Sequence, residues 1–141
     1  MKNYFMGVDI GTSSVRAVLF DIDGRQIHLE SVGCTIDASS EGYAELDPDE
    51  IVGSMISVIR RCVGNSGVAS SSITGIGLSC HMHSLMAVDA HGRPLTRLIL
   101  WADSRAKAEA DFINKNYDVG KLYKKTGCRV QHPMYPLSKI L

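Results

Sequence analysis

The stretch Gly7-Val8-Asp9-Ile10-Gly11-Thr12-Ser13-Ser14-Val15-Arg16 decides the fold. Residues 4–6, just before it, are apolar, and residues 15–21 alternate well enough to form a strand, so a β-strand is predicted on each side. Between them lies a tight polar turn, in which Gly11 can adopt backbone angles denied to other residues. The stretch therefore predicts two strands joined by a glycine-containing turn.

This turn carries groups that suit a phosphate. Three small hydroxyls, those of Thr12, Ser13 and Ser14, accompany exposed backbone N–H groups that can bind phosphoryl oxygens. Asp9 ends the first strand, and a carboxylate there is useful if it holds Mg²⁺, or a water on Mg²⁺, that bridges the phosphoryl oxygens. The alternative is an ordinary β-hairpin whose loop merely contains Gly and Ser.

Length, charge and cysteine content exclude several classes of protein. The chain has 141 residues, the size of one domain, and can bury a substantial core. Fifteen basic and fifteen acidic residues give a net charge of zero, so neither nucleic acid nor a membrane surface is expected as a partner. No secretory signal and no membrane-spanning stretch is expected. The four cysteines form no C-x-x-C pair, which predicts reduced thiols and a cytoplasmic protein.

The first part of the chain is predicted to be an antiparallel meander. Its three strands are expected at about residues 3–9, 15–22 and 26–35, with an Asp-Gly hairpin turn between the second and third. A polar loop is expected over 37–46. A helix then begins with Asp47 as N-cap, Pro48 at the first position and Glu50 as capping-box partner.

One face of this helix is apolar and is predicted to lie on the sheet, and the helix is expected to end near Gly64. The apolar positions are Ile51, Met55, Val58, Ile59, Cys62 and Val63. Arg60 and Arg61 are expected to face solvent. The next strand, 73–79, follows a crossover and is predicted to run parallel to the first strand.

The remainder of the chain alternates short elements. Gly75 and Gly77 weaken the strand at 73–79 and indicate the close approach of another backbone or of a ligand. Further strands are expected over 84–89 and 98–101, helices over about 103–116 and 118–127, and a last helix near the end of the chain. A chain that ends as a helix begins is expected to be part of a longer protein.

Three segments, in this order and at these separations, resemble the N-terminal part of the FGGY carbohydrate kinases. They are GVDIGTSSVRAVLFD (7–21), GLSCHMHSLMAVD (77–89) and WADSRA (101–106). The resemblance covers essentially the whole chain, and the tail, 124–141, is most similar to gluconate kinases. It implies an α/β fold of the actin-like, ribonuclease-H-like ATPase type, with a mixed sheet that starts with the meander and is flanked by helices. Residues 1–141 would then be the N-terminal part of the first domain, without the second domain.

The resemblance also implies an activity and its cofactors. The activity would be ATP-dependent phosphorylation of a sugar or sugar acid, gluconate to 6-phosphogluconate first, with a ketopentose such as xylulose as the competing substrate. The cofactors would be ATP and Mg²⁺. Asp9 would organise the Mg²⁺, Arg16 would add positive charge, and Gly11, Thr12 and Ser13 would lie under the β- and γ-phosphates.

The same resemblance implies a sugar pocket. Its residues would be His81, Met82 and His83, with Trp101, Asp103 and Arg105 as the wall. Polar side chains pair with sugar hydroxyls, an indole covers the C–H face, and a gluconate carboxylate requires a cation such as Arg105 or a histidine. The aspartate that acts as general base is expected downstream of residue 141. The chain alone is therefore expected to be inactive and to hold no catalytic residue.

Several of these residues have simpler interpretations. His81 and His83 with Asp103 could form a metal site, Trp101 could be a core residue, and Asp103 could cap the helix that follows it. Three of the cysteines, Cys34, Cys62 and Cys128, are most simply small buried hydrophobes.

Two other classes of function remain open. One is a non-catalytic module that senses a sugar or a nucleotide, and the other is an actin-like assembly protein, although the WADSR segment would have no evident role in a filament. Because part of a domain leaves strand edges unpaired, self-association of the chain is also expected.

Overall fold

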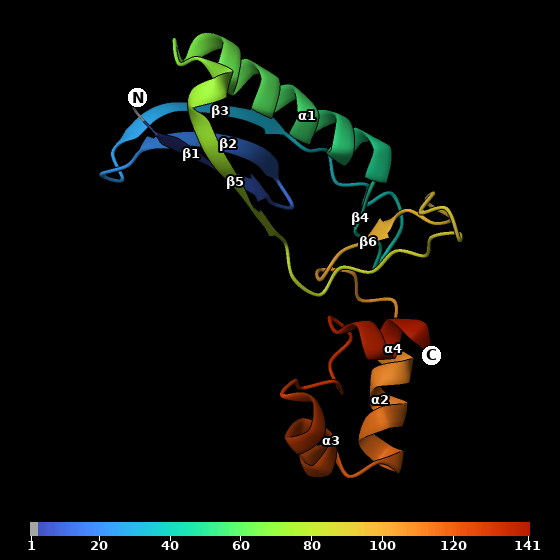
Figure 1. The fold of residues 1–141 in the computed structure, drawn as a ribbon. Helices are drawn as coiled ribbons and strands as arrows, with labels where there is room; N and C mark the ends of the chain where they lie inside the picture. Colours follow the sequence, from blue (N-terminus) through green and yellow to red (C-terminus); the bar gives the residue numbers. More distant parts are fainter. Residues whose placement is uncertain (1–2) are drawn as a thin grey trace. The chain divides into compact units, whose positions relative to one another are not determined.

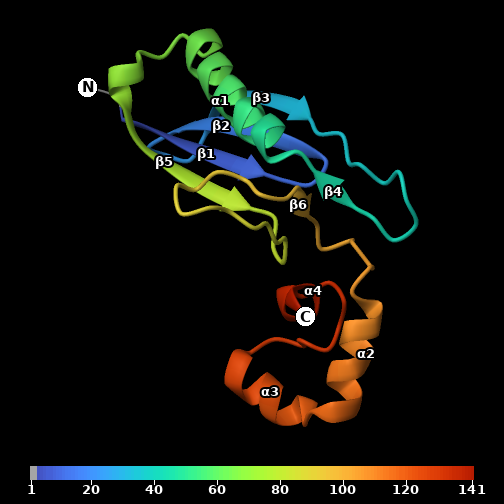
Figure 2. The same cartoon turned by 90° about the vertical axis from the view of Figure 1, so that its right-hand side faces the viewer.

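The structure is a computed structural model that describes residues 3–141. These residues form two compact units. The first comprises the chain up to Thr35 together with Pro48–His81, and the second comprises Ile36–Asp47 together with Met82–Leu141. The elements of both units are labelled in Figures 1 and 2. The boundary at 81/82 falls inside the predicted sugar-pocket motif.

A four-stranded mixed sheet with the order β3-β2-β1-β5 forms the first unit. Its strands are β1 (Tyr4–Ile10), β2 (Ser14–Asp21), β3 (Gln26–Gly33) and β5 (Ile73–Cys80). β2 pairs antiparallel with β1 and with β3, which confirms the predicted meander. β5 pairs parallel with β1, which confirms the predicted crossover.

Helix α1 (Pro48–Asn65) lies across one face of this sheet, on β2 and β3 (Figure 1). Alternate residues of the two central strands point toward it and are buried, because side chains along a strand alternate between faces. The buried strand residues are Met6, Val8, Ile10, Val15, Ala17 and Leu19. From the helix Ile51, Val58 and Cys62 complete the core, as the helical spacing predicted.

Arg61 is exposed, as expected, but its side chain also reaches the sheet. Its guanidinium donates to Glu30 Oε2 on β3, from Nε at 3.0 Å and from Nη2 at 2.6 Å. Asn65 donates to the other carboxylate oxygen at 2.8 Å, and His28 lies 3.2 Å from it. The hydrogen bonds from Asn65, Arg61 and His28 lower the pKa of Glu30 to about 2. A long side chain on a helix edge can thus reach a neighbouring strand that the helical pattern does not reveal.

The second unit holds five short elements. They are β4 (Glu45–Leu46), β6 (Leu98–Ile99), α2 (Lys107–Asn116), α3 (Val119–Thr126) and α4 (Pro136–Ile140). β4 and β6 pair antiparallel, and α4 packs on α2 (Figure 2). Helix α3 ends at Gly127 with φ +70°, a left-handed conformation that favours glycine, as predicted.

In this unit the structure differs from the predicted elements in the loop 37–46, in the strand 84–89 and at the start of the helix that follows residue 103. The predicted loop 37–46 contains β4, whose partner β6 is remote in sequence. The predicted strand 84–89 forms only isolated bridges. The Ala87 N–H donates to the Thr96 hydroxyl instead of to a strand carbonyl, and the Asp89 N–H donates to the Arg93 carbonyl within a turn. Helix α2 begins at Lys107 rather than at Asp103. The Asp103 carboxylate instead accepts from the Ala44 N–H and pairs with Arg105. No helix within residues 3–141 is both long and apolar enough to cross a membrane.

All four cysteines are free thiols, with Cys62 buried and Cys34 and Cys128 half-buried. Burial raises the pKa of the Cys62 thiol and of the Cys34 thiol, which favours their protonated forms. This confirms the prediction that Cys62 is a small buried hydrophobe. For Cys34 and Cys128 the prediction is confirmed only in part, because their side chains are half-buried.

Candidate functional site

The turn between β1 and β2 is closed by backbone contacts. The Gly11 N–H donates to the Ser14 carbonyl at 3.0 Å, and the Cys34 N–H donates to the Ser13 carbonyl at 2.9 Å. A Cβ atom on residue 11 would lie 3.0 Å from the Ser14 oxygen, closer than such contacts normally allow. Glycine is therefore required at this position by the close approach of the backbone. Thr12 and Ser13 are carried at the tip of this rigid turn.

Asp9 and Arg16 face each other across β1 and β2. They are register partners, and Arg16 Nη1 lies 3.4 Å from Asp9 Oδ2. Their side chains are 53% and 49% exposed, so this ion pair contributes at most about 1 kcal/mol. Such a weak pair leaves the Asp9 carboxylate accessible to a cation from solvent.

The face of the sheet opposite α1 is hollowed beside Asp9. Gly7 and Gly77 are register partners there and carry no side chains, and Ser79 lies beside Asp9 on β5. A shallow hollow results, lined by Gly7, Val8, Asp9, Val18, Phe20, Gly77, Leu78 and Ser79. A Cβ on Gly75 would meet the Phe5 ring at 3.7 Å, an ordinary van der Waals contact with a side chain, and nothing lies within 4 Å of a Cβ on Gly77. Neither glycine shows the predicted close approach of another backbone.

His81 ties the end of β5 to the end of β1. Its backbone N–H donates to the Ile10 carbonyl at 2.9 Å, and its ring Nδ1 lies 2.8 Å from the same oxygen. Because a carbonyl can only accept, Nδ1 carries the proton and Nε2 is left available for another partner. His81 therefore braces the strand end that leads into the Gly11 turn.

Met82 and His83 are the first residues of the longer segment of the second unit. The Met82 side chain is 72% exposed. His83 has φ +62°, a left-handed conformation that costs a side-chain-bearing residue energy. Its ring meets the Tyr135 ring edge-on, with centroids 4.5 Å apart. An aromatic contact thus holds the imidazole in place.

Asp103 is 2% exposed, and its carboxylate is fully engaged. It accepts from the Ala44 N–H at 3.0 Å, and both of its oxygens accept from Arg105 Nε at 3.0 Å. Burial opposes ionisation, but the hydrogen bonds from Arg105 and Ala44 hold the pKa of Asp103 below its usual value. The cap of α2 is Ala106, so the interpretation of Asp103 as the helix cap is wrong.

Arg105 is held between two carboxylates. It pairs with Asp103 and also donates to Glu45 on β4, and its guanidinium lies 3.7 Å above the centre of the Tyr43 ring. The hydrogen bond with Asp103 raises the pKa of Arg105. Glu45 and Tyr43 were missed because they lie in a segment predicted as loop. Trp101 is 47% exposed, so its interpretation as a core residue is wrong.

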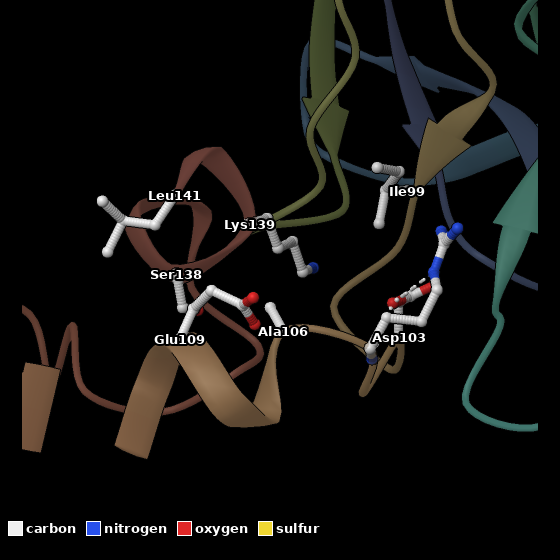
Figure 3. Close-up of a pocket in the computed structure, with 8 residues that line it drawn as sticks. Ile99, Asp103, Ala106, Glu109, Ser138, Lys139 and Leu141 are labelled. Carbon is white, nitrogen blue, oxygen red and sulfur yellow. Dashed lines mark hydrogen bonds and ion pairs between the residues drawn. The ribbon is translucent and has the colours of Figure 1, made fainter. Parts of the chain in front are cut away.

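A cavity of about 250 Å³ lies beside this cluster, within the second unit (Figure 3). Its lining residues are Ile99, Asp103, Arg105, Ala106, Glu109, Ser138, Lys139 and Leu141. Figure 3 shows Lys139 extending from α4 toward the segment that carries Ile99 and Asp103. Burial lowers the pKa of Lys139, although the charge of Asp103 opposes this change.

The predicted site residues fall into two groups. Asp9, Gly11, Thr12, Ser13, Arg16 and His81 lie in the first unit, and Met82, His83, Trp101, Asp103 and Arg105 lie in the second. Within residues 3–141 no three His, Cys, Asp or Glu side chains gather to hold a metal ion. The metal site suggested for His81, His83 and Asp103 is therefore not formed.

Comparison with known proteins decides the family. Residues 4–141 match the N-terminal domain of the FGGY family of carbohydrate kinases. The chain belongs to this family. The gluconokinases of Bacillus subtilis (strain 168) and Bacillus licheniformis are 38% and 39% identical to it over 140 residues. That alignment covers 99% of this chain but 27% of each gluconokinase.

Solved structures of FGGY kinases share the fold. A gluconate kinase from Lactobacillus acidophilus superposes with a TM-score of 0.89 at 31% identity, covering 99% of this chain and 27% of the kinase. A ligand-bound xylulose kinase from the same organism gives a TM-score of 0.88 at 31% identity, covering 97% and 27%. The fold is thus the actin-like ATPase fold of these kinases, as the resemblance implied. The predicted alternative of an actin-like assembly protein finds no support among these relatives.

Proposed function

We propose that this chain supplies the phosphate-binding turn and part of the sugar pocket of an ATP-dependent carbohydrate kinase, with gluconate as substrate and 6-phosphogluconate as product. The observation that carries the proposal is the half-exposed Asp9 carboxylate beside the closed Gly11 turn. An accessible carboxylate next to backbone N–H groups is the combination that a metal-bound phosphate requires. The choice of gluconate is supported by the identity to two gluconokinases.

In the first unit, the residues of the turn would bind Mg-ATP. Asp9 would hold Mg²⁺, directly or through water, and the ion would neutralise charge on the phosphoryl oxygens. Thr12 and Ser13 would offer N–H and hydroxyl donors to the β- and γ-phosphates, and Gly11, whose own N–H donates to the Ser14 carbonyl, would let the backbone approach them closely. Arg16, whose present pairing with Asp9 is weak, would add a second positive charge.

In the second unit, exposed side chains would contact the sugar. Trp101 and Met82 would cover its C–H face, and His83 would meet a hydroxyl. Asp103 and Arg105 would form the inner wall. Because Arg105 already pairs with two carboxylates, we assign the carboxylate of a sugar acid to the histidine of this unit, His83.

Turnover would require more protein than these 141 residues. The chain spans 27% of the length of the gluconokinases that it matches. We place the general base and the rest of the nucleotide site in the part of such a kinase that this chain does not span. We place the reaction in the cytoplasm, where ATP is supplied and free thiols stay reduced.

Xylulose is the second candidate substrate. Its support is the Lactobacillus acidophilus xylulose kinase, which superposes about as well as the gluconate kinase from that organism and has the same identity. The exposed residues proposed for the pocket would fit either a polyol chain or a ketopentose. Only the affinity for a carboxylate separates the two substrates.

Calorimetric titration of the 141-residue chain with gluconate, xylulose and Mg-ATP tests the proposal, together with a coupled kinase assay on the same sample. We expect weak gluconate binding, weaker xylulose binding and no turnover. Asp9→Asn should abolish the heat of Mg-ATP binding, because the amide is a poor Mg²⁺ ligand. Asp23→Asn is the matched control, an exposed aspartate in the turn between β2 and β3, and should leave that heat unchanged.

Each outcome decides a different part of the proposal. Binding of xylulose but not gluconate would replace the substrate and keep the kinase assignment. Turnover would mean that a carboxylate of this chain is the base, with Asp103 the first candidate. No binding of either sugar and no Asp9-dependent binding of Mg-ATP would contradict the proposed function of this chain.

A further inference from the structure

Lys139 connects two segments of the second unit that are remote in sequence. Its Nζ atom donates to the backbone carbonyl of Leu100 and, at 3.4 Å, to that of His83. Figure 3 shows the side chain extending from α4 toward the segment that carries Ile99 and Asp103. One ammonium group therefore fixes the backbone beside two residues, His83 and Trp101, that are proposed to contact the sugar.

His83 needs such external support. Among residues 3–141 it is the only non-glycine residue with positive φ, and a side chain in that conformation is strained. The strain is tolerated where surrounding contacts over-determine the backbone. Two contacts come from the same short segment of chain, the edge-on Tyr135 ring and the Lys139 ammonium.

Trp101 depends on Lys139 through the preceding peptide group. Leu100 is fully buried, and its carbonyl belongs to the peptide plane that leads into Trp101. That carbonyl accepts from Lys139 and from the Asp103 N–H at 3.1 Å. Because a peptide group is planar, fixing its oxygen limits the directions in which the Trp101 side chain can leave the backbone.

The base of Lys139 is itself held firmly. Its neighbour Ser138 is 1% exposed, and the single hydroxyl proton of Ser138 is shared between the carbonyls of Tyr135, at 2.9 Å from Oγ, and His132, at 3.2 Å. Helix α4 also packs on α2. The lysine side chain is half-buried between these elements and the cavity. Lys139 thus extends from an ordered support rather than from a free chain end.

We propose that Lys139 is a positioning residue, which holds His83 and Trp101 in the arrangement that receives the sugar. That they receive a sugar rests on the function proposed above. That Lys139 orders them rests on the contacts alone. The two parts can therefore fail separately.

The experiment uses the fact that Trp101 is the only tryptophan of the chain, so its fluorescence reports on this site alone. Lys139→Met removes the donor and keeps the length of the side chain. Lys121→Met, on α3, is the matched control, because Lys121 is 85% exposed. We expect a roughly twofold rise in acrylamide quenching of Trp101 for Lys139→Met, as local order is lost, and no change for Lys121→Met.

Two further measurements separate positioning from folding. Lys139→Arg should return quenching toward the wild-type value, because a guanidinium keeps the charge and the N–H donors. Gluconate affinity, read by titration of the same fluorescence, should fall roughly tenfold in Lys139→Met, since small misplacement of binding groups is costly. Far-UV circular dichroism checks that each variant remains folded. If Lys139→Met is unfolded, the quenching and gluconate titration are measured on Lys139→Gln instead.

Equal quenching in the wild type, Lys139→Met and Lys121→Met, with all three folded, would overturn the positioning role. Changed quenching without rescue by Lys139→Arg would overturn it also, since the loss would then not follow from the donor group. A wild type that binds no sugar would contradict the proposed function, while the quenching comparison would still decide the role of Lys139.

Discussion

At the scale of single residues, the predicted site residues differ in how open they are to a ligand. Asp9 is half-exposed and weakly paired, whereas Asp103 is buried and has strong partners. An exposed ion pair contributes little to stability, and a buried one is costly to break by removing one partner. Asp9 is therefore suited to binding a cation from solvent, and Asp103 to holding its surroundings in place.

A side chain at position 11 should be unfavourable. We expect Gly11→Ala to destabilise the protein by about 1 kcal/mol, because the new Cβ would press on the Ser14 carbonyl 3.0 Å away. It should also weaken Mg-ATP binding by distorting the turn. Gly33→Ala, where nothing lies within 4 Å of the new Cβ, is the control for chemical denaturation and calorimetry. Equal stability of the two variants would contradict the requirement for glycine.

Removal of the Arg105 guanidinium should leave a buried charge unpaired. We expect Arg105→Met to lower the free energy of unfolding by about 3 kcal/mol, because Asp103 would lose its charged partner and keep only the backbone N–H donors of Ala44 and residue 105. Arg93→Met removes a pair with Asp89 in which the arginine is 74% exposed, and should cost about 0.5 kcal/mol. Urea denaturation measures both. Similar losses would show that the Arg105 cluster is not structural.

At the scale of elements, α1 is joined to β3 by polar contacts as well as by its apolar face. Glu30 accepts from Arg61 and Asn65 of the helix, so a single carboxylate connects the two layers of the first unit. The amphipathic pattern of α1 encodes the apolar contact alone. The polar connection depends on which strand lies under the edge of the helix.

The Glu30 contacts predict a pH dependence of stability. Folding lowers the pKa of Glu30 from 4.5 to about 2, so its stabilising effect is complete above pH 4.5 and is lost as the pH falls toward 2. In that window the unfolded state binds more protons. The free energy of unfolding should therefore decline more steeply with acidification in the wild type than in Glu30→Gln. Parallel slopes in urea titrations at several pH values would contradict this assignment.

The outer edge of β5 should mediate self-association. β5 is an edge strand without a charged residue, and Ile76 and Leu78 on it are 53% and 62% exposed. Such an edge offers unpaired backbone groups to another chain. We expect light scattering to show concentration-dependent oligomers for the wild type and mainly monomer for Leu78→Lys. Asp111→Lys, at an exposed position of α2, is the control. A wild-type monomer at all concentrations would rule the association out.

At the scale of the whole molecule, the residues proposed to bind ligands are divided between two compact units. The residues proposed to bind phosphate belong to the first unit, and most of those proposed to contact the sugar belong to the second. This division follows the chain, which leaves the first unit after Thr35, returns at Pro48 and leaves again after His81. The proposed phosphate-binding residues and most of the proposed sugar-contacting residues are therefore held by separate sets of contacts.

The sequence by itself determined the features that depend on neighbouring residues. Period-two alternation predicted the meander, helical spacing predicted the buried face of α1, and Gly127 predicted the end of α3. The segment around Asp9 predicted a phosphate-binding turn, because strand, carboxylate and glycine turn follow one another directly in the chain. Each of these signals is local, and backbone propensity or side-chain periodicity is enough to read it.

Only the tertiary structure decided which distant groups meet. Three long-range contacts cannot be predicted from any periodic pattern in the sequence. They are the pairing of Arg105 with Glu45, that of Arg61 with Glu30, and that of Lys139 with the His83 and Leu100 carbonyls. The same is true of β4 and β6, which are too short to show a pattern and form because they pair with each other. The energy of such contacts arises when the chain brings the partners together, and no local segment encodes it.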